Sequence, residues 1–113
     1  MIEIIIKNYL AEKLSVPVVL EVPADPPKSF VLLEKAGSSR EEHIDRAMLA
    51  IQSHAPSMYE AARLNERVKA AMDSAAELDA VSASRLNSDY NFTDTTTKRY
   101  RYQAVYDLVY YDE

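Results

Sequence analysis

The residue types that most often carry enzyme chemistry are scarce in this sequence. It contains no cysteine and a single glycine, Gly37. Cysteine nucleophiles and thiolate metal ligands are therefore excluded, and one glycine cannot build the Gly-rich loops that cradle phosphates. The two histidines, His43 and His54, are eleven residues apart and do not match the spacing of a zinc-binding helix. We expect both histidines to be surface or strand-end residues, and we expect no metal site.

Carboxylates are the remaining candidates for general acid–base catalysis. Eighteen of the 113 residues are acidic, so close pairs of carboxylates are expected by chance. Glu41 and Glu42 lie in a stretch that we expect to be mobile, which is a poor place to hold catalytic geometry. Solvated charges on helices and loops also explain the central acidic residues, Asp45, Glu60, Asp73, Glu77 and Asp79. The sequence predicts no catalytic residue, no cofactor and no enzyme.

The charge pattern argues against nucleic acid as the main partner, and the short apolar stretches argue against a membrane. The formal net charge is −5, and the thirteen Lys and Arg residues are scattered except for the cluster Lys98-Arg99-Tyr100-Arg101. Specific binding to phosphate backbones normally needs a basic face. No apolar stretch approaches the length that spans a bilayer, and a cysteine-free chain suits a reducing cytoplasm.

Tyrosine is used far more often than the other aromatic residues. The chain has eight Tyr, two Phe and no Trp. The segment Arg99–Tyr111 alternates, with Tyr100, Tyr102, Ala104, Tyr106, Leu108 and Tyr110 on one face and Arg101, Gln103, Val105, Asp107, Val109 and Tyr111 on the other. The tyrosine face is expected to pack on the domain's own helices. The alternative is a platform on which a ligand stacks, and single-stranded nucleic acid would need basic neighbours there.

The chain length suits one domain built on one core. We expect an α+β fold, in which a mixed or antiparallel β-sheet of about four to five strands packs against a short N-terminal helix and one longer central helix. Helices are predicted at Ile2–Leu14, whose isoleucines would equally suit a strand, and at Pro56–Ala76. Strands are predicted at Val16–Val22, Ser29–Lys35, Val81–Leu86 and Arg99–Tyr111, with a mobile loop at Ala36–Glu42 and a long connection at Asn87–Thr97.

The residue pattern of one segment, His43–His54, is compatible with either a helix or a strand. Its periodicity slightly favours a helix, but the same residues also line one face of a strand.

The predicted strands carry apolar residues on both faces. Phe30 and Leu32 alternate with Val31 and Leu33, for example. A sheet covered on one side only should alternate apolar with polar residues. If the helices lie on one side, the other face must therefore contact another chain.

Read in order, these segments resemble the tail terminator (tail completion) proteins of long-tailed bacteriophages and prophages. The resemblance spans nearly the whole chain, so residues 1–113 would form one tail-terminator-like domain. It is carried by the helix ending in Tyr9-Leu10, Val16-Pro17-Val18, Glu21-Val22-Pro23, Pro26-Pro27 before Phe30-Val31, Ala36-Gly37, Ala50-Ile51-Gln52-Ser53-His54-Ala55, Tyr59-Glu60-Ala61 and Arg99-Tyr100-Arg101-Tyr102-Gln103. The lone Gly37 departs from the family, whose loops often contain more glycine.

The resemblance implies that Glu42–Ser53 is largely a strand. It also implies a structural virion protein that forms a ring, usually of six subunits, on the head-proximal end of the tail tube. Such a ring ends tube polymerisation and provides the surface that joins the head, and it needs no cofactor. The implied partners are other copies of the chain, the tail tube protein and a head-completion or connector protein, with assembly in the host cytoplasm and residence in the virion tail.

Two surfaces are candidates for these contacts. A subunit interface is predicted at the non-tyrosine face of the last strand, through Arg101, Val105, Val109 and Tyr111. A mobile partner-binding loop is predicted at Gly37, Ser38, Ser39, Arg40 and Glu41. The alternatives are another head–tail connector, a minor tail protein, or a module that binds a small ligand or peptide in a concave site.

Overall fold

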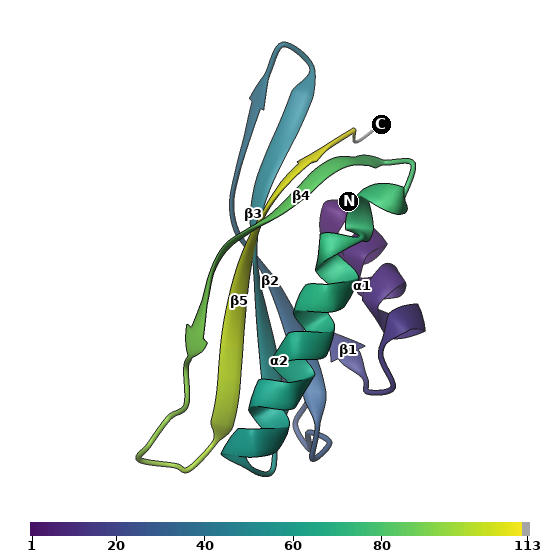
Figure 1. Cartoon of the computed structure of the whole chain (residues 1–113). Helices are drawn as coiled ribbons and strands as arrows, with labels where there is room; N and C mark the ends of the chain where they lie inside the picture. The colour runs from purple at the N-terminus through teal and green to yellow at the C-terminus, as the bar shows by residue number, and fades with distance from the viewer. Residues whose placement is uncertain (112–113) are drawn as a thin grey trace.

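A computed structural model describes residues 1–111 and confirms the expected α+β fold (Figure 1). The elements follow in the order α1 (Ile2–Lys13), β1 (Val18–Val19), β2 (Phe30–Glu41), β3 (Ile44–Ala55), α2 (Met58–Asp73), the short 3₁₀ helix η1 (Ala75–Glu77), β4 (Val81–Asn91) and β5 (Tyr100–Tyr110). Neither α-helix in this part of the chain is long and apolar enough to cross a membrane.

The five strands form one sheet in the order β1-β2-β3-β5-β4. β1 runs parallel to β2, and the other neighbouring strands are antiparallel. Both helices lie on the same side of the sheet, with α2 across β3 and β5 and α1 beside it (Figure 1). We call the face under the helices the inner face and the opposite one the outer face. The core is formed by the inner face and the helices, with Ile6, Leu10, Leu33, Leu49, Ile51, Val68, Met72, Tyr106 and Leu108 buried in it.

The central helix α2 begins after the N-cap residue Ser57. The Ser57 hydroxyl accepts a hydrogen bond from the Glu60 amide at 3.2 Å and donates one to the Glu60 carboxylate at 3.0 Å. The predicted stripe is buried, with Ala61, Val68 and Met72 fully enclosed. The helix ends at Asp73, a few residues before the predicted end at Ala76, and η1 follows.

The last strand has the predicted faces. Ala104, Tyr106, Leu108 and Tyr110 are buried on the inner face. Tyr100 and Tyr102 are only half-buried at the opposite end of β5. The expected packing of the tyrosine face against the helices is therefore correct for the second half of the strand.

The prediction of a loop at Ala36–Glu42 is wrong. β2 continues to Glu41 and pairs with β3 from Ile44 onward, so the connection is the two-residue turn Glu42-His43. Ala36 is an extra residue in a β-bulge between Lys35 and Gly37. This half of the hairpin projects beyond the helix layer (Figure 1), so its residues need not be apolar and their polarity resembles that of a loop. We call residues 36–48 the hairpin arm.

Three other segments differ from the sequence expectations. His43–His54 belongs largely to β3, as the resemblance implied, and the helical periodicity was misleading because the second half of this central strand is buried on both faces. The strand predicted at Val16–Val22 is reduced to Val18–Val19, where backbone pairing with β2 is present. Asn87–Asn91, predicted as part of a connection, extends the edge strand β4.

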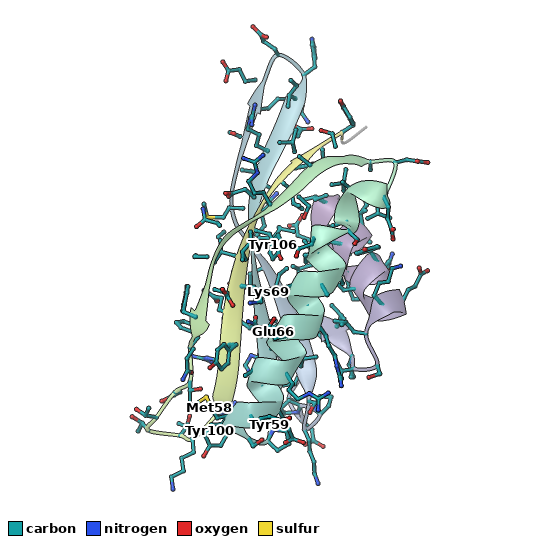
Figure 2. All side chains as sticks on the ribbon, in the orientation of Figure 1. Met58, Tyr59, Glu66, Lys69, Tyr100 and Tyr106 are labelled. Atoms are coloured by element: carbon teal, nitrogen blue, oxygen red, sulfur yellow. The ribbon has the colours of Figure 1, made fainter. Side chains whose placement is uncertain are left out.

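A polar network ties the edge strand β4 to α2. Tyr106 on β5 donates a hydrogen bond to Asp73 at 2.7 Å, and Lys69 contacts Asp89 on β4 at 2.8 Å and Glu66 at 3.0 Å. Asn65 donates to the same Asp89 carboxylate at 2.9 Å. Figure 2 labels Lys69 and Glu66 on α2 and Tyr106 on β5 beside it.

These contacts shift the proton affinities of the groups involved. Hydrogen bonds to Asp89 and Glu66 raise the pKa of Lys69, and the bond from Lys69 lowers the pKa of Asp89. Burial, followed by the bond to Asp73, raises the pKa of Tyr106. All three groups therefore keep their usual charge at neutral pH, and the network is a structural link.

Candidate protein-docking surface

The outer face has no helix over it, yet its central side chains are buried. Strand alternation places Phe30, Leu32, Ala50 and Val105 on this face, opposite the core residues of the same strands. All four are buried without belonging to the core under the helices. They are covered by neighbouring side chains of the sheet and, at one end, by the proline-rich segment between β1 and β2. This face is therefore apolar at its centre and thinly covered.

A chain of polar side chains crosses the outer face from β3 to β4. His54 Nε2 lies 3.0 Å from Gln52 Oε1, and Gln52 Nε2 donates to Gln103 Oε1 at 3.0 Å. Gln103 Nε2 in turn donates to the Tyr90 hydroxyl on β4. These hydrogen bonds satisfy polar side chains on three strands, although no helix covers this face.

His54 also stacks on Phe30, its cross-strand neighbour, with ring centroids 4.4 Å apart and nearly parallel planes. Burial lowers the pKa of His54 to about 4, and the positive charges of Arg101 and Arg99 act in the same direction. The imidazole is therefore neutral at neutral pH, and its Nε2–H can donate to Gln52.

The stacked rings form the floor of a cleft at one end of the outer face. The cleft has a volume of about 400 Å³. Its walls are the segment containing Val22, Pro26 and Pro27 on one side and residues 98–101 on the other. Four cationic side chains and one carboxylate line it, namely Lys28, Lys98, Arg99, Arg101 and Glu34. We call it the basic cleft.

The opposite end of the sheet is the hairpin arm. Arg40 and Asp45 face each other across the two strands, and Arg40 Nη2 lies 3.1 Å from Asp45 Oδ2. The turn residues Glu42 and His43 have φ values of 52° and 68°, which is the left-handed region of a type I′ turn. Because type I′ turns normally use Asn and Gly, this turn is strained by about 1 kcal/mol or more per residue.

The structure places three of the four sequence-predicted interface residues on the outer face. Arg101, Val105 and Val109 share the outer face, where Val105 is buried and the other two are half-buried. Tyr111 follows β5 directly and is 56% exposed. The residues predicted as a partner-binding loop, Gly37, Ser38, Ser39, Arg40 and Glu41, lie together in the exposed part of β2. The two predicted sites therefore border one another through β3.

The histidines fall where the sequence predicted, His43 in an exposed turn and His54 near the end of β3. The residues that sequence reasoning missed are Phe30, Gln52, His54 and Tyr90 as members of the outer face. Alternation along β3 would have identified Gln52 and His54 had that segment been assigned as a strand. Tyr90 could not be found, because its segment matched no strand pattern. Across residues 1–111, no group of three or more His, Asp or Glu side chains is arranged to hold a metal ion.

Comparison with known proteins adds no family assignment. No protein-family model matches the chain. No curated protein matches it significantly.

Proposed function

We propose that this protein is a structural subunit that self-associates through its outer face into a ring, and that the ring caps the head-proximal end of a phage tail tube. The observation that carries the proposal is the outer face itself. Beside its buried centre it leaves apolar side chains accessible, Met48 at 39% exposure and the half-buried Val109, with polar side chains around them, which is the usual anatomy of a subunit contact. The resemblance to tail terminator proteins supports the proposal of a ring and of the tail tube as its binding partner.

The arrangement of side chains suits binding better than catalysis. The strongest polar cluster, around Tyr106 and Lys69, fixes β4 to α2, and the pKa shifts of Lys69, Asp89 and Tyr106 favour their ordinary charge states. The neutral His54 has hydrogen-bonding and stacking partners in the sheet. A closed ring requires head-to-tail contacts between two different surfaces of the subunit, and the hairpin arm and outer face supply different surfaces.

The experiment is tube termination in vitro. The purified protein is added to polymerising tail tube protein, and tubes are measured by negative-stain electron microscopy. A terminator should sit as a ring on one end of each tube and shorten the tubes in proportion to its concentration. Binding along the tube walls, or tubes of unchanged length, would contradict the proposal.

A second candidate function is favoured by the basic cleft. Its concave shape, apolar floor and cationic lining would suit a small anionic ligand or an acidic peptide in a monomeric binding module. Sedimentation velocity separates the two functions. A binding module should stay at 12.8 kDa at every concentration, whereas the ring subunit should form larger species as concentration rises.

A further inference from the structure

The two ends of the molecule carry surfaces of opposite character. The longest dimension is 44 Å, and the β2–β3 turn lies at one end of it while the β4–β5 connection lies at the other (Figure 1). The first end is the tip of the hairpin arm and the second holds the basic cleft. A molecule with such ends can associate head to tail.

The tip of the arm presents acidic groups beside an apolar residue. Glu41 and Glu42 are exposed and form no ion pair with another residue of the described chain. Ile44 follows them and is 36% exposed. The positive charge of Arg40 is balanced by Asp45, and Arg46 lies further from the tip. The tip therefore offers two unbalanced carboxylates and an aliphatic side chain.

The basic cleft offers the matching groups. Within residues 1–111, Lys28, Lys98 and Arg99 have no carboxylate within ion-pair distance. Arg101 is held in place, because its Nε donates to the Phe92 carbonyl at 2.7 Å and its guanidinium lies 4.6 Å from the Phe92 ring. Asp94 in the same connection accepts hydrogen bonds from the Thr96 and Thr97 amides and is not among the lining residues.

We propose that the arm tip of one copy inserts into the basic cleft of the next, with Glu41 and Glu42 against Lys98 and Arg99. Ile44 then packs toward the Phe30–His54 floor. The inference deepens the proposed ring and rests on it. Only the two-residue turn and the side chains beside it need to enter the cleft, because β2 and β3 are joined directly through Glu42 and His43. The cleft's volume is within the usual range for ligand sites.

The cleft contact alone is too small for a stable interface, which buries on the order of 1,000 Å² or more. We assign the remaining area to the outer face around Met48 and Val109, at the end of β5 that adjoins the arm, where apolar side chains are still partly exposed. Charge complementarity at the tip then sets which surfaces meet and in which direction, while apolar burial supplies most of the affinity. The contact joins two different surfaces, so repetition closes a ring or extends a filament.

Charge reversal with rescue tests the proposal. The tip variant E41K/E42K and the cleft variant K98E/R99E are each analysed by sedimentation velocity at low salt. Each should need at least tenfold more protein than wild type to self-associate. An equimolar mixture, or the quadruple variant, should return to within about threefold of wild type, because reversed tips then meet reversed clefts. The control E12K/D79K changes the net charge as much as the tip variant does and lies on the helix side, so it should associate normally.

Each other outcome is decisive. Normal self-association of both reversal variants would overturn the inference and leave the proposed ring intact. Loss in both variants without rescue in the mixture would also overturn it, because the charges would then act elsewhere. Binding of a DNA oligonucleotide that is lost only in K98E/R99E, with self-association unchanged, would assign the cleft to nucleic acid. If the wild-type protein stays monomeric both in solution and on tail tubes, the proposed function and this inference are both contradicted.

Discussion

At the centre of the sheet both faces are buried, but by different means. On the inner face, Leu49, Ile51 and Tyr106 are completely enclosed because α1 and α2 lie over them. On the outer face, Phe30 and Val105 are covered only by side chains of the sheet and by the segment between β1 and β2. Polar groups there are paired with one another, mostly across neighbouring strands.

The difference separates stability from association. A face closed by helices cannot exchange its partners without unfolding, so its residues set the stability of the monomer. A face whose polar groups are already paired can meet either water or another protein at little cost. Changes on the inner face should therefore destroy the fold, and changes on the outer face should mainly alter assembly.

The largest expected effect is on the inner face. Val68 of α2 is 0% exposed in the core, so Val68→Asp would bury an unpaired charge at a cost of several kcal/mol. Because domains of this size are stable by about 5–15 kcal/mol, we expect loss of the folded state. Circular dichroism and solubility report it, and Val68→Ala should remain folded with a lower Tm. A soluble Val68→Asp protein that melts like wild type would show that this face is not the core.

A smaller effect is expected within the outer face. Gln52→Ala removes the partner of both His54 and Gln103. Leaving them unsatisfied should cost about 1–2 kcal/mol of unfolding free energy, measured by urea denaturation. The double variant Gln52→Ala/Gln103→Ala should cost less than the sum of the single variants, since both act on one hydrogen bond. Strict additivity would mean that the polar chain does not act as a unit.

The smallest effect concerns the pH dependence of stability. The pKa of His54 is lowered from 6.5 to about 4 in the folded protein, so the unfolded chain takes up the proton first as pH falls. Stability is therefore lost between pH 6.5 and pH 4 and is unaffected by this group above pH 6.5. Since the ring is partly exposed, we expect about 1 kcal/mol. His54→Gln should lose less stability than wild type over this window, and equal losses would contradict the assignment.

The sequence predicted the inner face well and the arm poorly, for a physical reason. Core contacts impose a period on the residues, and the stripe through Val68 and the alternation through Tyr106 follow it. No core contact acts on Gly37 through Glu41, where backbone pairing with β3 and the Arg40–Asp45 ion pair specify the strand. A polar strand of this kind has the composition of a loop.

The candidate docking surface was predicted in part. Val105, Val109 and Arg101 follow from alternation along one strand, and the structure places them on the outer face. Phe30 and His54 stand 24 residues apart in the sequence, and their stacking depends on the register between β2 and β3. The basic cleft depends further on the segment between β1 and β2, whose path no local pattern encodes.

The central claim, that the outer face joins subunits, is tested most directly at Val109. This half-buried residue lies on the outer face between Arg46 and Ala83 of the neighbouring strands. Sedimentation velocity and circular dichroism are measured on wild type, Val109→Asp and the control Val109→Thr. We predict that Val109→Asp keeps the wild-type spectrum and stays monomeric, because a charge would be desolvated at the contact, while Val109→Thr still assembles. An unfolded Val109→Asp monomer would show that this face is internal core, and rings that persist would place the subunit contact elsewhere.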